Sequence, residues 1–314
     1  MTATIEVQDL KKVYRGFRRK PVEALRGISL RVGQGTIFGL IGQNGAGKTT
    51  LVKILLGLSE PTAGSAQVLG FSPRNPATRL RLGYLPEQIR LPDYFKADDF
   101  LRYMGALNGV DSRSLGKRMP ALLEKVGLKG NYKPVRAYSK GMLQRLGLAQ
   151  ALINDPEVLL LDEPTDGLDP LGRRDVRDLL IGLRAEGKTI FLNSHLLSEI
   201  ELVCDQIAIM DKGNLARMAT PAEFTRGTGE YVVRVAAASD RVSAAAASVL
   251  GEHVYWQQNS FRFAPRDLRQ LNSLLDRLRS VPVDIESVEP IRLSLEEFFI
   301  EVVAEQAANV ANVS

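Results

Sequence analysis

The sequence predicts an α/β fold built on a parallel core sheet, followed by a smaller α+β domain. Two apolar runs, 158–161 and 190–192, have the length of buried strands, and segments with helical spacing alternate with such runs. A glycine-rich turn lies between another predicted strand and a helix. Near residue 220 the character of the chain changes, and a β-α-β-β-α-β order follows, which is typical of a small split-βαβ domain.

The composition is that of an ordinary globular protein. The chain has 314 residues, of which 45% are hydrophobic and 25% charged, so disorder is excluded as its main state. The 27 glycines follow no three-residue period, which excludes a collagen-like chain. The single cysteine, Cys204, cannot form an intrachain disulfide, so a reducing compartment is permitted.

Charge and hydropathy indicate a cytoplasmic protein. No run approaches the roughly 18 consecutive apolar residues of a membrane span. Residues 1–12 lack the apolar core of a secretory signal. The net charge of +5 and the pI of about 9.3 are weak indications of a nucleic-acid or anionic-membrane partner, so we favour an ordinary solvated surface.

The elements predicted for the main domain, residues 1–219, combine a parallel sheet with an antiparallel part and a helical insert. The pattern between about 91 and 153 is mainly helical, and we interpret this segment as the insert. The other elements expected here are strands over 4–13, 35–41, 157–161, 189–192 and 206–210, and helices over 49–58 and 176–183.

Residues 220–314 are expected to form the accessory domain. The elements predicted for it are a strand over 231–235, a helix over 242–250, strands over 254–258 and 261–264 paired through Asn259-Ser260, a helix over 268–278, a strand over 285–288 and a helix over 294–304. The tail 306–314 is small and polar, so we expect it to be frayed.

The strongest chemical signal is GQNGAGKT at 42–49, which has the form G-x-x-x-x-G-K-[ST] between a predicted strand and a predicted helix. Its glycines let backbone N–H groups cradle phosphate oxygens, and the helix N-terminus adds partial positive charge. Lys48 can reach the β- and γ-phosphates of a nucleotide, and the Thr49 hydroxyl can hold Mg²⁺. The residues expected to bind nucleotide in this loop are Gly42, Gln43, Asn44, Gly45, Ala46, Gly47, Lys48, Thr49 and Thr50.

A second signal is VLLLDEP at 158–164. A buried strand brings Asp162 and Glu163 to its carboxyl end, which is the edge of an open α/β sheet where ligands bind. Asp162 is expected to bind Mg²⁺, directly or through water, and Glu163 to polarise the attacking water. Taken alone, an Asp-Glu pair at the end of a strand more often forms a helix cap or a turn. The phosphate loop earlier in the chain makes the catalytic interpretation the better one.

Between these two motifs stands YSKGMLQRL at 138–146. Four further short segments, KKVYRG, YLPEQ, GLDP and LNSHLLSE, complete a set of motifs. The set, in this order over residues 4–215, resembles the nucleotide-binding subunit of an ATP-binding cassette (ABC) transporter. The resemblance implies that Ser139 and Gly141 meet the γ-phosphate of the ATP bound to a partner subunit. It further implies roles for Tyr14 in KKVYRG, which stacks on adenine, Gln88 in YLPEQ, which contacts Mg²⁺, Asp169 in GLDP, and His195 in LNSHLLSE, which senses the γ-phosphate.

Three of these matches also have a plainer interpretation. Tyr14 could be an ordinary aromatic residue at the end of a strand, Gln88 a loop residue, and His195 a core histidine with satisfied hydrogen bonds. The position of each residue in the set favours the functional role. The six basic residues within 11–20 surround Tyr14, and we expect most of them to be solvated.

The signature segment departs from its common form, LSGGQ, at two positions. Lys140 stands where the family has glycine, and Met142 where it has glutamine. Both residues flank the expected contact with ATP, so they affect the affinity of the signature segment for that ATP. The two residues expected to make the contact, Ser139 and Gly141, are present. The segments YSKGM, GYLPE and EPTDGLDP, and a C-terminal extension ending SLEEFFIEVV, resemble exporter-type subunits that work with a separate permease.

The resemblance implies an ATPase that uses ATP and Mg²⁺ to power transport, with export as the direction. One chain has one phosphate loop and one signature, so a head-to-tail homodimer is implied. An integral membrane permease is the implied second partner, at the inner face of the cell membrane. It would dock on residues 89–100, where Tyr94 and Phe95 are candidate anchors. No nucleic-acid partner is expected; the alternative is a cassette ATPase of regulation or DNA maintenance.

Overall fold

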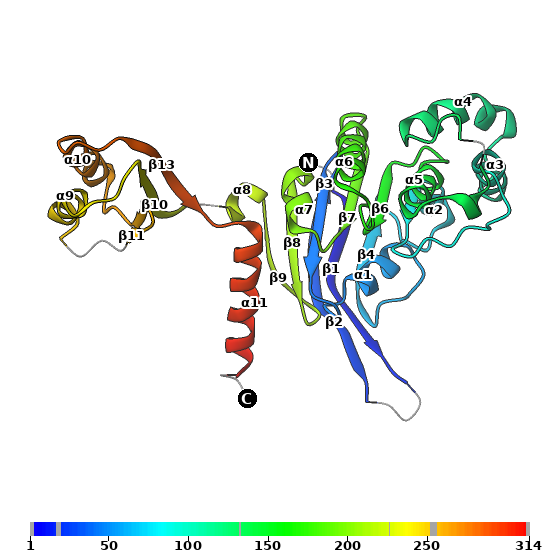
Figure 1. Cartoon of the computed structure of the whole chain (residues 1–314). Helices are drawn as coiled ribbons and strands as arrows, with labels where there is room; N and C mark the ends of the chain where they lie inside the picture. Colours follow the sequence, from blue (N-terminus) through cyan, green and yellow to red (C-terminus); the bar gives the residue numbers. More distant parts are fainter. Residues whose placement is uncertain (1–2, 17–19, 132, 226, 252–255, 312–314) are drawn as a thin grey trace. The chain divides into compact units, whose positions relative to one another are not determined.

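The computed structural model describes residues 3–16, 20–131, 133–225, 227–251 and 256–311. The chain divides into two compact units, Met1–Pro221 with Phe299–Ser314, and Ala222–Phe298 (Figure 1). The division groups 299–314 with the first unit, whereas the sequence analysis assigned them to the accessory domain. Independent folding of 220–314 stays a prediction.

A six-stranded sheet forms the centre of the first unit. Its strand order is β5-β6-β7-β3-β8-β9, and every neighbouring pair is parallel except the last. β6 and β7 are buried at every position, which explains why their sequences are nearly continuous apolar runs. The strands are β3 (Ile37–Gly42), β5 (Leu82–Leu85), β6 (Val158–Asp162), β7 (Thr189–Asn193), β8 (Gln206–Asp211) and β9 (Asn214–Ala219).

A three-stranded antiparallel sheet, in the order β2-β1-β4, completes the β structure of this unit. One hydrophobic core joins it to the central sheet and includes Ile5, Leu51 and Phe38. Its strands are β1 (Ala3–Tyr14), β2 (Val22–Gly33) and β4 (Ala63–Val68). The predicted antiparallel part of the fold is therefore confirmed.

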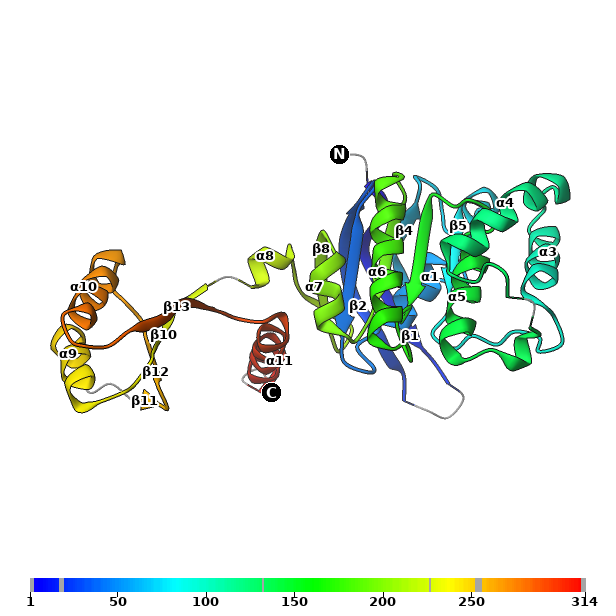
Figure 2. The same cartoon turned by 45° about the horizontal axis from the view of Figure 1, so that its top comes forward.

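The predicted helical insert is confirmed as three α-helices near the β5 edge of the sheet (Figures 1 and 2). They are α3 (Ala97–Leu107), α4 (Ser112–Lys125) and α5 (Lys140–Ala151), with a short 3-10 turn η1 (Val135–Ala137) before α5. Figure 2 shows α6 (Pro170–Ala185) lying across one face of the sheet. The remaining helices of this part are α1 (Lys48–Leu55), α2 (Pro76–Leu80) and α7 (Leu197–Val203).

In the first unit, α1 and α6 have bounds that differ from the prediction, because the residues that set their ends lie outside the apolar pattern. α1 ends before Gly57, whose φ of 68° is left-handed, so the helix does not reach residue 58. α6 begins at Pro170, six residues earlier than predicted, because Asp169 caps it and proline suits a first helical position.

The second unit has the predicted β-α-β-β-α-β order and one antiparallel sheet, β11-β12-β10-β13. Ser260 pairs with Gln257, so the turn lies at 258–259 and not at the predicted Asn259-Ser260. Residues 254 and 255 of the predicted strand lie outside the described residues. The elements are β10 (Gly227–Val235), α9 (Asp240–Leu250), β11 (Trp256–Gln257), β12 (Ser260–Phe263), α10 (Leu268–Arg279) and β13 (Ile285–Arg292).

Along the chain, α8 (Pro221–Phe224) precedes β10 and α11 (Leu295–Ala311) follows β13. The prediction of a frayed tail is wrong for 306–311, because the helix continues there. The alanines of this stretch favour helix. Residues 312–314 lie outside the described part. Among the described residues, no helix is both long and apolar enough to cross a membrane.

Candidate functional site

The loop from Gly42 to Lys48 connects the end of β3 to the start of α1 and is closely packed from beneath. A Cβ on Gly42 would lie 2.4 Å from the carbonyl oxygen of Met210, and one on Gly47 would lie 2.4 Å from the carbonyl oxygen of Ala24. The φ of Gly47 is 103°, which only glycine adopts without strain. Packing therefore requires glycine at both positions, and the backbone conformation requires it at Gly47 as well.

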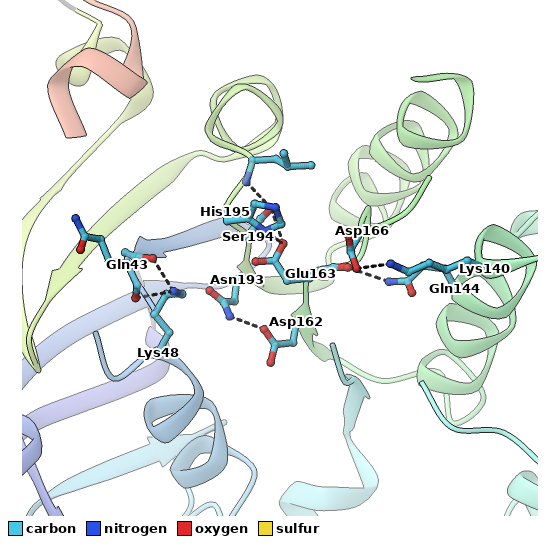
Figure 3. A network of polar contacts seen from close by, with 12 residues as sticks. Gln43, Lys48, Lys140, Gln144, Asp162, Glu163, Asp166, Asn193, Ser194 and His195 are labelled. Carbon is cyan, nitrogen blue, oxygen red and sulfur yellow. Dashed lines mark hydrogen bonds and ion pairs between the residues drawn. The ribbon is translucent and has the colours of Figure 1, made fainter. Parts of the chain in front are cut away.

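The start of α1 offers backbone donors without a side-chain cap. No side chain caps the N-terminus of α1, so the first backbone N–H groups of the helix remain available to an anion. Thr49 is exposed and Thr50 half-buried in this first turn. Lys48 Nζ donates to the carbonyl oxygens of Gly42 at 2.6 Å and Gln43 at 3.2 Å (Figure 3).

Negative side chains face Lys48. Burial lowers the pKa of its ammonium group, and the nearby charges of Glu163, Asp162 and Glu87 act in the opposite direction. Lys48 of the phosphate loop and the two acids at the end of β6, Asp162 and Glu163, are therefore close enough to interact electrostatically. A nucleotide phosphate with a divalent cation matches such a mixed set of charges.

Asp162 ends β6 beside Asn193, which ends β7, and the two residues are paired in the parallel register. Asn193 Nδ2 donates a hydrogen bond to Asp162 Oδ1. Burial raises the pKa of the Asp162 carboxyl group, and Glu87 and Glu163 raise it further. The Asn193 hydrogen bond and Lys48 oppose this rise. Asp162 is thus a desolvated carboxyl group whose charged form depends on a donor and a cation.

Glu163 is held on several sides (Figure 3). Its Oε2 accepts a hydrogen bond from Ser194 Oγ at 3.1 Å and lies 2.8 Å from His195 Nδ1. Its carbonyl oxygen accepts from Gln144 Nε2 at 3.0 Å, and its N–H donates to the carbonyl oxygen of Asn193. Two predicted catalytic residues, Glu163 and His195, are therefore in direct contact.

The signature segment forms the start of α5. Ser139 caps the helix, with its Oγ accepting from the N–H of Met142 at 3.2 Å. Lys140 does not lie free beside this cap, because its Nζ is 2.7 Å from Asp166 Oδ2 and its stem covers Gly167. Gly141 faces Leu168, whose Cδ2 would be 3.0 Å from a Cβ at residue 141. Asp169 caps α6 in turn through its bond from the N–H of Gly172.

Tyr14 and Gln88 are among the predicted site residues that lie outside the hydrogen-bond network of Figure 3. Tyr14, at the end of β1, is 42% exposed, and Lys12 Nζ lies 5.0 Å from its ring centroid. Gln88 follows β5 and is exposed. Because its ring is exposed, Tyr14 is accessible to a nucleotide base. Residues 17–19 of the basic run lie outside the described residues.

Three residues of this site were not predicted from the sequence: Asn193, Ser194 and Gln144. The first two could have been found, because they directly follow a buried strand, and the carboxyl ends of neighbouring parallel strands meet at one edge. Gln144 could not, since its contact with Glu163 depends on how α5 packs.

The oxygen atoms that these predicted site residues offer suit Mg²⁺ as ligands. Thr49, Asp162 and Gln88 offer hydroxyl, carboxylate and amide oxygens, and the side-chain oxygen of Asn193 is buried without a hydrogen-bond partner. No group of three or more His, Cys, Asp and Glu residues able to hold a metal occurs among the described residues. Mg²⁺ keeps several waters and binds through one or two carboxylates plus phosphates, so it does not need such a group.

The chain matches a family model described as "ABC transporter" over residues 25–166. It is 40% identical over 308 residues to an uncharacterized ABC transporter ATP-binding protein of Synechocystis sp., which covers 96% of this chain and 85% of the relative. The chain belongs to the ATP-binding subunits of ABC transporters. This ABC subunit is therefore an ATPase, as its resemblance implied.

Further comparisons agree with this assignment. The ABC subunit is 40% identical over 238 residues to the Nod factor export ATP-binding protein I of Ralstonia nicotianae, covering 74% of this chain and 73% of that protein. A solved ATP-binding subunit of an ABC transporter matches with a TM-score of 0.63 and 29% identity, covering 71% of this chain and 92% of that one. These relatives favour a transport role over regulation or DNA maintenance.

Proposed function

We propose that this ABC subunit works as a homodimer and powers export through a separate integral membrane permease, at the cytoplasmic face of the membrane. The observation that carries the catalytic part is the contact of Glu163 with His195 beside Lys48 and Asp162. Export is supported by the name of the relative from Ralstonia nicotianae. The role of each site residue below belongs to this proposal.

The phosphates of ATP bind the loop at 42–50. Lys48 exchanges the carbonyl oxygens of Gly42 and Gln43 for the β- and γ-phosphates, a move within reach of its flexible stem. Thr49, Asp162 and Gln88 hold Mg²⁺, which supplies charge neutralisation at the phosphates when bound. Tyr14 stacks on adenine.

Hydrolysis depends on the groups around Glu163. Its carboxylate accepts a proton from the attacking water, while Ser194 and His195 keep it oriented. His195 is exposed on one side, so its ring can also reach the γ-phosphate. Positioning and charge stabilisation, and not covalent chemistry, supply the rate acceleration.

The second subunit completes each site with its signature. Ser139 Oγ already accepts a bond from Met142, so its O–H remains available to donate to a phosphate oxygen. Gly141 exposes backbone N–H at a helix start without a side chain in the way. Asp169 caps the N-terminus of α6 by accepting from the N–H of Gly172.

The test uses the full chain with Mg·ATP. We expect Glu163→Gln to bind ATP, to lose steady-state turnover by about 10²-fold or more, and to accumulate as an ATP-bound dimer by light scattering. Adding Ser139→Ala should abolish that dimer while each monomer still binds ATP. Lys48→Ala is the control that should lose nucleotide affinity instead.

Normal turnover in Glu163→Gln would reject Glu163 as the base, and a persistent dimer in the double variant would reject the signature contact. The permease is tested by affinity purification of the tagged wild type from membranes of its own cells. A polytopic membrane protein should co-purify, and a wild type that stays entirely in the soluble fraction would reject this part.

A further inference from the structure

We propose that Asn193 is a positioning residue for the metal site. Its amide N–H holds Asp162, and its buried side-chain oxygen accepts a hydrogen bond from a water molecule that enters with Mg²⁺. This inference rests on the proposed use of Mg·ATP and assigns a role to a residue to which the sequence motifs gave none.

The first observation is the direct contact between the two side chains. Asn193 and Asp162 are both 3% exposed and stand opposite each other at the carboxyl ends of β7 and β6. Asn193 Nδ2 donates to Asp162 Oδ1, and Figure 3 shows the amide between Asp162 and Lys48. A carboxylate only accepts hydrogen bonds, so the amide nitrogen must face Asp162 and the amide oxygen must face away from it.

The second observation is the state of the Asn193 amide oxygen, at the other end of the amide group. Asn193 Oδ1 is buried and has no hydrogen-bond partner among the described residues. A buried acceptor without a partner is costly, and native proteins satisfy most such atoms with protein groups or ordered water. A water molecule that reaches this oxygen can supply the missing hydrogen bond.

The chemistry of asparagine suits this position. A lysine or arginine would also orient Asp162 but would neutralise the charge that attracts a cation. The amide donates one hydrogen bond and adds no charge, so Asp162 keeps its full affinity for a divalent ion. Partners of this kind, one step removed from a metal, typically change metal affinity by about 10- to 100-fold when mutated.

The backbone of Asn193 gives the side chain a fixed base. Its carbonyl oxygen accepts from the N–H of Glu163 at 2.8 Å, so the same residue contacts both acids of the site. Ser194, the next residue, bonds to Glu163 and not to Asp162. This division provides a matched control, because Ser194→Ala disturbs the proposed base without disturbing the proposed metal ligand.

The experiment measures binding of a fluorescent ATP analogue to the full chain, first in EDTA and then as Mg²⁺ is added. For Asn193→Ala we expect the affinity in EDTA to stay within twofold of wild type. The Mg²⁺ concentration for half-maximal enhancement should rise about 10-fold or more. Ser194→Ala should leave this concentration unchanged and lower only turnover.

A second variant, Asn193→Ser, keeps a hydroxyl donor and guards against a folding defect in Asn193→Ala; its Mg²⁺ requirement should lie between wild type and Asn193→Ala. Thermal melting without nucleotide checks that each variant is folded. Unchanged Mg²⁺ requirements in both variants, against a Mg²⁺-dependent wild type, would overturn this inference alone. A wild type that binds nucleotide without any Mg²⁺ dependence would overturn both the inference and the proposed function.

Discussion

Glu163 has a φ of 52°, a left-handed conformation that costs a non-glycine residue about 1–2 kcal/mol. Bonds to Asn193 and Gln144 fix both its N–H and its carbonyl group, so two elements hold it in place. Strain of this kind persists where surrounding structure over-determines it, and it clusters at active sites. The backbone therefore supports the role proposed for this carboxylate, independently of the motif.

The glycines of the phosphate loop make a testable pair at the same scale. Gly45 and Gly47 both have positive φ, but only Gly47 is packed, because a Cβ there would lie 2.4 Å from the carbonyl oxygen of Ala24. Gly45→Ala should cost only the conformational strain of about 1–2 kcal/mol. Gly47→Ala should cost a further ~1–3 kcal/mol, because β2 must move.

Urea unfolding of both variants without nucleotide measures this difference. Equal losses of stability in the two variants would show that β2 shifts at little cost and that packing does not require glycine at residue 47. Far-UV circular dichroism of the folded baselines provides the control for secondary structure.

At the scale of elements, α5 is joined to the loop after β6 by contacts from one helix face. Lys140 and Gln144, four residues apart, reach Asp166 and the Glu163 carbonyl oxygen. The signature departure noted in the sequence, Lys140 for glycine, thus has a structural partner in the same chain. Asp166 has a lowered pKa, chiefly because of the Lys140 hydrogen bond.

This ion pair should contribute little to stability. The Lys140 and Asp166 side chains are 63% and 40% exposed, so solvent and salt screen their attraction. A double-mutant cycle with Lys140→Gly and Asp166→Asn should give a coupling energy below about 1 kcal/mol, falling toward zero in about 1 M salt. A larger, salt-independent coupling by urea unfolding would mean that the pair fixes the loop by packing.

The elements also show what the sequence could predict. β6 and β7 are recognisable as apolar runs because both faces are buried. β4 reads AGSAQV, and only Val68 of its residues is buried, so its pairing with β1 leaves no pattern of its own. The acids of the site were predictable from a motif. The position of Asn193 at the end of an apolar run was also visible in the sequence, but its contact with Asp162 follows only from the pairing of β7 with β6.

At the scale of the whole molecule, the predicted site residues all lie between Tyr14 and His195, within the first unit. A chain ending at residue 219 should therefore remain soluble and bind ATP. It also lacks 299–311, which group with the first unit, so its melting temperature should be lower than that of the full chain. Circular dichroism and nucleotide titration measure both, and an unfolded product would reject the independence of the main domain.

A permease is expected to dock on the surface of the helical insert at residues 89–100. Tyr94 is 73% exposed, whereas Phe95 is half-buried and contacts the rings of Phe100 and Tyr103. The backbone of Phe95 is also tied down, since its carbonyl oxygen accepts from the N–H of Val135 at 2.8 Å. The two aromatics therefore differ. Phe95 packs the insert, whereas Tyr94 touches it only through the Phe95 ring, at 4.7 Å between centroids, and keeps most of its surface exposed.

We expect Tyr94→Ala to reduce recovery of the chain with membranes while ATP binding stays unchanged, because exposed aromatic anchors carry much of the energy of an interface. Phe95→Ala should instead lower the melting temperature. Leu58→Ala is the matched control, since Leu58 is 68% exposed at another place in the first unit and its loss should change neither property. Membrane recovery of Tyr94→Ala equal to wild type would move the docking surface away from residues 89–100.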